Sequence, residues 1–164
     1  MRVLVSVASR HGGTREMGEV IAATLRDAGF DVDEVEPDEV EQVSAYDAVV
    51  LGSAVYVGRL ALGLRDLVDR QAGQLRDLPA WLFWSGPVGE QATPPAAPDD
   101  VADVAKTIDV RGVQMFLGRL ERAELNISER ALVALVRAKP GDYRDMEVVA
   151  EWAGTIAKEL TRGR

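Results

Sequence analysis

The stretch Ser9-Arg10-His11-Gly12-Gly13-Thr14 decides the fold of this chain, because it joins an uninterrupted apolar run, residues 3–8, to a helical pattern. A loop that leaves a buried strand and enters a helix presents free backbone N–H groups, and the positive end of the helix dipole, to one point. The hydroxyls at its two ends can donate to phosphate oxygens, and its two glycines let the backbone curl closely around an anion. The loop therefore predicts a site for a phosphomonoester, with an ordinary strand-to-helix turn capped by Thr14 as the alternative.

Three phosphate-binding motifs can be compared with this loop. A P-loop requires Gly-Lys-Ser/Thr, and no lysine lies near Thr14. The dinucleotide pattern Gly-x-Gly-x-x-Gly is absent, since the glycines stand at positions 12, 13 and 18. The remaining pattern, Ser-x-x-Gly-x-Thr, resembles the one with which flavodoxin-like proteins hold the phosphate of FMN, although His11 stands where a flavodoxin usually has Thr. Arg10 and Arg15 also flank the phosphate position and are candidates for pairing with it, with solvent exposure as the alternative.

Two further loops extend the resemblance to the flavodoxin-like superfamily over nearly the whole chain. One follows the apolar run 48–51, and the other follows the run 80–84 and lacks the aromatic residue usual there. The resemblance implies a noncovalently bound FMN, with its phosphate in the first loop and its ring covered by the other two. The implied FMN-binding residues are Ser9, Arg10, His11, Gly12, Gly13 and Thr14 in the first loop, Ser53, Ala54, Val55, Tyr56, Val57 and Gly58 in the second, and Ser85, Gly86, Pro87, Val88 and Gly89 in the third.

The second and third loops offer different groups to a flavin ring. Tyr56 supplies a flat face that can stack on the ring, with a place at the sheet edge as the alternative. In flavodoxins a carbonyl of this loop turns toward flavin N5 when the flavin gains one electron and one proton, and Val57-Gly58 is the matching peptide. The third loop is expected to hold the pyrimidine end through backbone groups. Trp84, which lies in an apolar run, is expected in the core, with a second stacking face for the flavin ring as the alternative.

Within the superfamily the chain looks most similar to the branch that includes the menaquinone-dependent protoporphyrinogen dehydrogenases. That branch also carries Thr-Arg-Glu after the first loop, here Thr14-Arg15-Glu16, and the closing run Gly141-Asp142-Tyr143-Arg144-Asp145 is typical of proteins close to it. The branch has a helical segment before the last helix, and here residues 121–140 predict a helix opened by Asn126. The charges of this segment are mixed rather than strongly basic, which favours packing over contact with a quinone-bearing membrane.

Composition limits the possible functions. A chain of 164 residues with 47% hydrophobic and 28% charged residues predicts one globular domain over residues 1–164. Because there is no cysteine, redox chemistry requires a bound organic cofactor, and the single histidine has no companion for a metal site. The chain begins directly with a strand and has no apolar run near the ~20 residues of a membrane span, which predicts a cytoplasmic location. The net charge of −8 argues against nucleic acid as a partner.

The hydrophobic pattern predicts an α/β, flavodoxin-like doubly wound fold with an open parallel five-stranded sheet and helices on both faces. The runs 3–8, 48–51, 80–84 and 113–117 are expected in its centre, because strands covered on both faces are continuously apolar. Residues 30–35 alternate apolar and acidic side chains as an edge strand does. The expected strand order, 2-1-3-4-5, brings the three loops to one crevice. The helical faces are Met17, Val20, Ile21, Leu25 and Ala28; Leu64, Leu67, Val68 and Leu75; and Val148, Trp152, Ile156 and Leu160.

Three functional classes remain open. An electron carrier exchanges electrons with a redox partner protein, whereas an FMN-dependent dehydrogenase takes hydride from a small substrate such as a porphyrinogen and delivers electrons to a quinone. A flavin-free binding module that keeps only the scaffold is the third. The acidic stretch 31–41 is interpreted as a solvated edge, with docking of a basic redox partner as the alternative. The proline-rich segment 91–100 is expected to be irregular.

Overall fold

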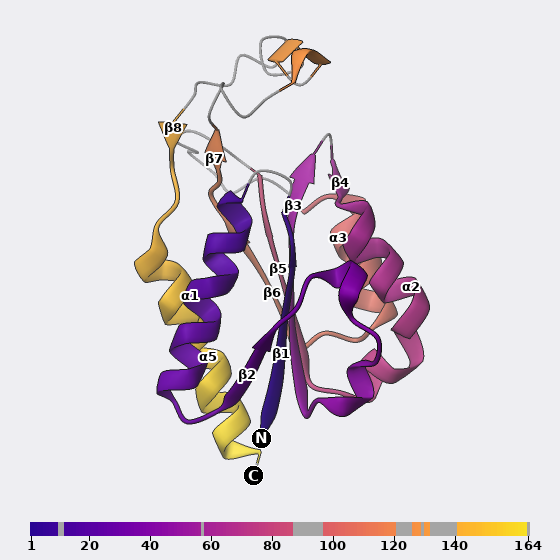
Figure 1. Cartoon of the computed structure of the whole chain (residues 1–164), viewed down its shortest axis with the longest axis vertical. Helices are drawn as coiled ribbons and strands as arrows, with labels where there is room; N and C mark the ends of the chain where they lie inside the picture. Colours follow the sequence, from indigo (N-terminus) through magenta and orange to yellow (C-terminus); the bar gives the residue numbers. More distant parts are fainter. Residues whose placement is uncertain are drawn as a thin grey trace.

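Five parallel strands form the central sheet in the order β2-β1-β3-β5-β6, with helices on both faces (Figure 1). The computed structural model describes residues 1–9, 12–56, 58–86, 97–120, 126–128, 130–131 and 141–163. The strands are β1 (Arg2–Ala8), β2 (Asp31–Glu34), β3 (Ala48–Tyr56), β5 (Ala80–Ser85) and β6 (Gly112–Phe116). The predicted order is confirmed. The numbering shifts because a short strand, β4 (Arg59–Leu60), pairs antiparallel with the end of β3.

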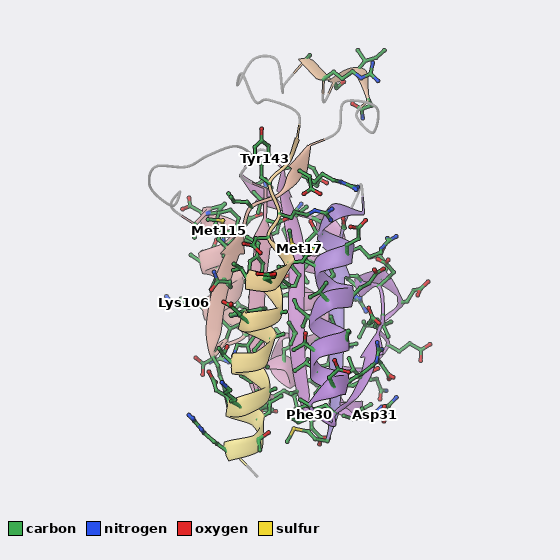
Figure 2. All side chains as sticks on the ribbon, turned by 90° about the vertical axis from the view of Figure 1, so that its left-hand side faces the viewer. Met17, Phe30, Asp31, Lys106, Met115 and Tyr143 are labelled. Carbon is green, nitrogen blue, oxygen red and sulfur yellow. The ribbon has the colours of Figure 1, made fainter. Side chains whose placement is uncertain are left out.

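Two layers of helices cover the sheet. The helices α1 (Gly13–Asp27) and α5 (Met146–Arg162) lie side by side on one face, while α2 (Leu62–Arg76) and α3 (Asp99–Thr107) cover the other (Figures 1 and 2). Two short 3-10 helices, η1 (Pro37–Glu39) and η2 (Val43–Ala45), complete the second layer. Each long helix turns one apolar stripe toward the sheet, so the core consists of two apolar layers separated by the strands.

Burial separates the central strands from the edges. All of β5, and every residue of β1 after Arg2, are buried, as continuous apolar runs predict. The placement of residues 113–117 in the sheet centre is wrong, because β6 is an edge strand and Val113 is 43% exposed. The assignment of Val148 to a buried helix face is also wrong: it is 42% exposed, and the first fully buried residue of α5 is Val149.

The sequence does not predict the helix α3, and the irregular segment expected before it extends too far. The helix begins at Asp99, directly after Pro98, so the prediction that residues 99 and 100 are irregular is wrong. Proline suits this position because its fixed φ fits a helix start and its missing N–H needs no partner there. Val101 and Val104 form the buried stripe of this helix, a signal too short to stand out in the sequence. Residues 91–96 lie outside the described residues.

Beyond β6 the chain forms a two-stranded ribbon that sequence patterns did not predict. The strand β7 (Arg119–Leu120) pairs antiparallel with β8 (Gly141–Asp142), and the N–H of Tyr143 donates to the carbonyl of Gly118 at 3.1 Å. Figure 2 places Tyr143 at the end of the molecule opposite to Phe30 and Asp31. The ribbon therefore lies at the same end as the carboxyl ends of the strands.

Only part of the predicted helix after β7 falls within the described residues. Residues 127–128 and 130–131 are helical, and the N–H of Arg130 donates to the carbonyl of Asn126 at 2.9 Å, as expected for a helix that opens there. The apolar side chain of Ile127, in the first turn of this helix, is 86% exposed. That side chain therefore does not pack against the described core.

A glycine in the central sheet accommodates a cluster of three aromatic rings. The ring of Phe83 lies 5.7 Å from that of Phe116 and 5.9 Å from that of Trp152, in tilted and edge-to-face arrangements. Phe83 stands directly beside Gly52 on the neighbouring strand. A Cβ at Gly52 would overlap the Phe83 ring, so only glycine fits beneath it.

We expect Gly52→Ala to lower the free energy of unfolding by about 2–3 kcal/mol, because the added methyl group overpacks a core that cannot relax easily. Urea unfolding measures this loss. Gly154→Ala is the matched control, since an added Cβ meets nothing within 4 Å in the middle of α5. The control should gain about 0.5–1 kcal/mol from helix propensity. Equal effects of the two substitutions would contradict the packing argument.

Candidate functional site

The carboxyl ends of three neighbouring strands bring the three predicted loops together. In the parallel register Ala8 lies opposite Ser53, and Ala54 lies opposite Ser85, so the three loops leave the sheet at adjacent positions. Such an edge is where ligands bind in doubly wound sheets. The described members of the predicted site are Ser9, Gly12, Gly13, Thr14, Ser53, Ala54, Val55, Tyr56, Gly58, Ser85 and Gly86, while Arg10, His11, Val57, Pro87, Val88 and Gly89 lie outside the described residues.

The first loop opens α1 with a glycine cap. Gly12 has a φ of 82°, which a glycine adopts without strain, and its N–H donates to Ser9 Oγ at 3.1 Å. The first helical hydrogen bond runs from the N–H of Glu16 to the carbonyl of Gly12 at 3.1 Å. The N–H groups of residues 13–15 therefore have no acceptor within the helix, and a glycine cap has no side chain to offer them. They form a potential anion site.

A buried pair of hydroxyls links the first and third loops. Thr14 Oγ1 and Ser85 Oγ lie 2.9 Å apart, and both side chains are almost fully buried. A hydroxyl donates one hydrogen bond and accepts others, so one member of this pair keeps a proton for a further acceptor. Sequence reasoning placed both residues in the site, but it did not predict that they contact each other across 71 positions of the chain.

The second loop is a hairpin whose base is fixed by a buried serine. Ser53 Oγ accepts the N–H of Ala61 at 2.9 Å and donates to the carbonyl of Ala54 at 2.7 Å. Tyr56 pairs with Arg59 across the hairpin. Gly58 has a φ of 74°, the left-handed conformation that favours glycine in such turns. Ser53 thus holds the loop, while the half-buried Tyr56 lies next to its turn.

An aspartate on α3 accepts hydrogen bonds from the second strand of the same hairpin. Asp100 accepts from Arg59 Nε at 2.9 Å and from the N–H of Leu60 at 3.1 Å, with Arg65 at 3.9 Å. The hydrogen bond from Arg59 and that from the Leu60 amide lower the pKa of the Asp100 carboxyl below its ordinary value. Sequence reasoning missed this contact, because Asp100 lies 41 positions from Arg59 and belongs to no motif.

Close backbone packing joins the second and third loops. A Cβ at Gly86 would lie 2.9 Å from the carbonyl oxygen of Val55, and a Cβ at Gly118 would lie 3.5 Å from the nitrogen of Gly86. Glycine at position 86 therefore lets this backbone approach that of Val55 closely, whereas a Cβ at Gly118 would make only an ordinary van der Waals contact. Trp84, just before the third loop, is buried in the core as predicted.

An arginine from the closing run Gly-Asp-Tyr-Arg-Asp reaches the first loop. Arg144 binds Asp142 through two hydrogen bonds, from Nε at 2.9 Å and from Nη2 at 2.8 Å. Its Nη1 donates to Glu16 at 2.7 Å and to the carbonyl of Gly13 at 3.1 Å. The Arg144 side chain is only 8% exposed. These contacts lower the pKa of Asp142 to about 2, chiefly through the Arg144 hydrogen bond, and raise that of Arg144.

Arg15 was a candidate for phosphate pairing, but it turns toward the edge strand. It forms an ion pair with Glu36 at 2.7 Å. Two further members of the acidic stretch are paired in the same way, Asp33 with Arg2 at 2.6 Å and Glu34 with Arg26 at 3.0 Å. Part of the predicted acidic edge is therefore neutralised by arginines of this chain itself.

Within the described part of the chain, no group of three histidine, cysteine, aspartate or glutamate side chains is placed to hold a metal ion. The same residues include no helix that is long and apolar enough to cross a membrane.

The fold and the arrangement of its loops define a flavodoxin-type protein. The family described as Flavodoxin domain matches residues 4–147, and the chain belongs to that family. Among curated proteins it is similar to the protoporphyrinogen IX dehydrogenase (quinone) of Escherichia coli strain K12, with 28% identity over 85 residues. The matched region is 51% of this chain and 47% of that protein, so the chain spans about half the length of this relative.

Solved flavodoxins share the whole fold. A flavodoxin from the domain Archaea matches with a TM-score of 0.65 and 14% identity, covering 98% of this chain and 99% of that chain. The flavodoxin of Streptococcus pneumonia TIGR4 matches with a TM-score of 0.62 and 20% identity over 100% of both chains. At these identities the likeness shows the fold alone.

The pKa of Asp142 predicts how stability depends on pH. A carboxyl whose pKa falls from 3.8 to about 2 on folding stabilises the fold fully above its unfolded pKa, and this contribution is lost as the pH falls through 2. Asp142→Asn should therefore have a lower free energy of unfolding than the unmodified chain at pH 6, and this difference should shrink toward pH 2. Urea unfolding at several pH values measures it. In an Arg144→Met background the pH dependence of this difference should disappear, and its persistence would contradict the assigned pair.

Proposed function

We propose that this chain binds FMN noncovalently at the carboxyl edge of the sheet and passes electrons through it. The observation that carries the proposal is the start of α1, where a glycine cap with φ of 82° leaves backbone N–H groups for an anion beside two buried hydroxyls. Flavodoxin-family membership supports the identity of the guest, because flavodoxins typically bind FMN. A phosphate dianion suits this position, since the helix dipole and N–H groups favour negative charge.

The residues of this chain fit the phosphate and the ring of FMN. The first loop, with Gly12, Gly13 and Thr14, would hold the phosphate, while backbone groups of the second and third loops would hold the ring. Tyr56 would offer a flat face to the ring. Bound FMN supplies one- and two-electron chemistry that no side chain of this cysteine-free chain provides. The anchored hairpin and the close packing at Gly86 would keep water away from one side of the ring.

A second candidate function is an FMN-dependent dehydrogenase that takes hydride from a porphyrinogen and delivers electrons to a quinone. The similarity to protoporphyrinogen IX dehydrogenase (quinone) of Escherichia coli favours it, although it covers about half of each chain. Two measurements on the purified protein distinguish the three functional classes. Visible absorption of bound flavin supports both redox functions, and turnover of a porphyrinogen with a quinone distinguishes the enzyme from the carrier. A protein that neither retains nor binds flavin would instead be a binding module on the same scaffold.

We expect Thr14→Val to weaken FMN binding by about tenfold, because hydrogen bonds to a charged group contribute ~1.5–3 kcal/mol. Riboflavin, which has no phosphate, should bind almost unchanged. Fluorescence titration of the flavin-stripped protein with both ligands measures the two effects. Thr24→Val is the matched control, since Thr24 lies on the same helix and its hydroxyl donates to the Val20 carbonyl at 2.9 Å.

Two results would remove Thr14 from the phosphate site. One is an equal loss of FMN and riboflavin affinity in Thr14→Val, which would place the hydroxyl near the ring or in the fold alone. The other is failure of Thr14→Ser to restore the preference for FMN, because serine keeps the hydroxyl that the proposal requires.

A further inference from the structure

We propose that Arg144 is a positioning residue for the phosphate end of the site, which acts by fixing the first turn of α1 and by neutralising Glu16. The inference rests on the proposed binding of FMN and adds a residue that lies outside all three loops. Arg144 follows β8, and Figure 1 shows this ribbon beyond the start of α1, at the carboxyl edge of the sheet. Its guanidinium joins the ribbon to the helix through hydrogen bonds to Asp142, Glu16 and the carbonyl of Gly13.

The geometry of the guanidinium fixes its plane. Its paired hydrogen bonds to Asp142 hold the group in one orientation, as bidentate arginine–carboxylate pairs do. The Arg144 side chain is 8% exposed, whereas those of Asp142 and Glu16 are 51% and 47% exposed. The cation is therefore enclosed, with the two carboxylates at its outer rim. An enclosed, doubly bonded arginine is a firmer support than a pair of exposed side chains.

Arg144 controls the direction of a donor in the proposed phosphate site. The carbonyl of Gly13 and the N–H of Thr14 belong to one planar peptide group, so holding the carbonyl at 3.1 Å also holds the N–H. In a helix the carbonyl points toward the C-terminal end and the N–H toward the N-terminal end. The contact therefore aims the Thr14 N–H out of the helix start, where an anion would lie.

Arg144 also offsets a charge that opposes phosphate binding. Glu16 lies in the first turn of α1, where a carboxylate interacts well with the helix dipole but repels another anion at the same end. Arg144 binds Glu16 at 2.7 Å, and Arg119 lies 3.8 Å from it. Without Arg144, the negative charge of Glu16 would act on the ligand phosphate with less compensation. Both effects concern the phosphate and leave the ring unaffected.

The test compares FMN with riboflavin in Arg144→Met. We expect the dissociation constant of FMN to rise by about tenfold, and that of riboflavin by less than about twofold, in fluorescence titrations of the flavin-stripped protein. Arg26→Met is the matched control, because Arg26 also bridges a carboxylate and a backbone carbonyl, those of Glu34 and Val32, but at the other end of α1. It should leave both dissociation constants unchanged.

Removing the charge of Glu16 distinguishes a positioning role of Arg144 from a merely structural one. Adding Glu16→Gln to Arg144→Met should recover part of the lost FMN affinity, since it removes the charge that Arg144 neutralises. Arg144→Lys, which keeps a charge without the paired geometry, should fall between the unmodified chain and Arg144→Met. If Arg144→Met does not fold, as shown by circular dichroism, this lysine variant carries the comparison. Equal losses for FMN and riboflavin, or unchanged FMN binding, would overturn the inference.

Inorganic phosphate distinguishes failure of this inference from failure of the proposed function. If the unmodified protein binds neither flavin, FMN binding is not its function, and phosphate is titrated instead by ³¹P NMR. Weaker phosphate binding in Arg144→Met would then support the positioning role without the flavin. Phosphate binding that is absent, or equal in both proteins, would overturn it.

Discussion

The hydrogen-bond ladder that holds β1, β3 and β5 parallel and in register is the constraint on which the site depends. It places Ala8 beside Ser53 and Ala54 beside Ser85, so each strand delivers its loop to the same edge. A slip of one residue would turn every side chain of a strand to the opposite face. The packing of Phe83 over Gly52 and the hydrogen bond between Thr14 and Ser85 both require this register. Packing of the core and assembly of the site are thus set by the same pairing.

The electrostatics of the loop end differ from those of the chain as a whole. The net charge is −8, yet the network around the start of α1 combines two arginines, Arg119 and Arg144, with two carboxylates, Glu16 and Asp142. Such a balanced network adds little attraction of its own for an anion. An anion at this end would therefore be attracted chiefly by the backbone N–H groups at the start of α1, which are most effective when their directions are fixed.

Features with a local signal could be predicted from the sequence, whereas those that depend on distant residues could not. The apolar runs predicted the strands, and the pattern from Ser9 to Thr14 predicted the glycine-rich turn into α1. An apolar run does not show whether its strand lies in the centre or at the edge of the sheet. Residues 113–117 were therefore expected in the centre, although β6 is the last strand of the sheet. Contacts such as Asp100 with Arg59, or Arg144 with Gly13, join residues 41 and 131 positions apart and leave no periodic trace.

The separation between Gly13 and Arg144 also orders events during synthesis and folding. The glycine-rich turn is made first, while the arginine that supports it follows 131 residues later. A contact between such distant positions closes a long loop, and other contacts must offset the entropy of closing it. In a nascent chain the turn is therefore present before the arginine that contacts it has been made. The contact between Arg144 and Gly13 is thus a mark of the completed fold, because it requires segments from near both ends of the chain to be in place.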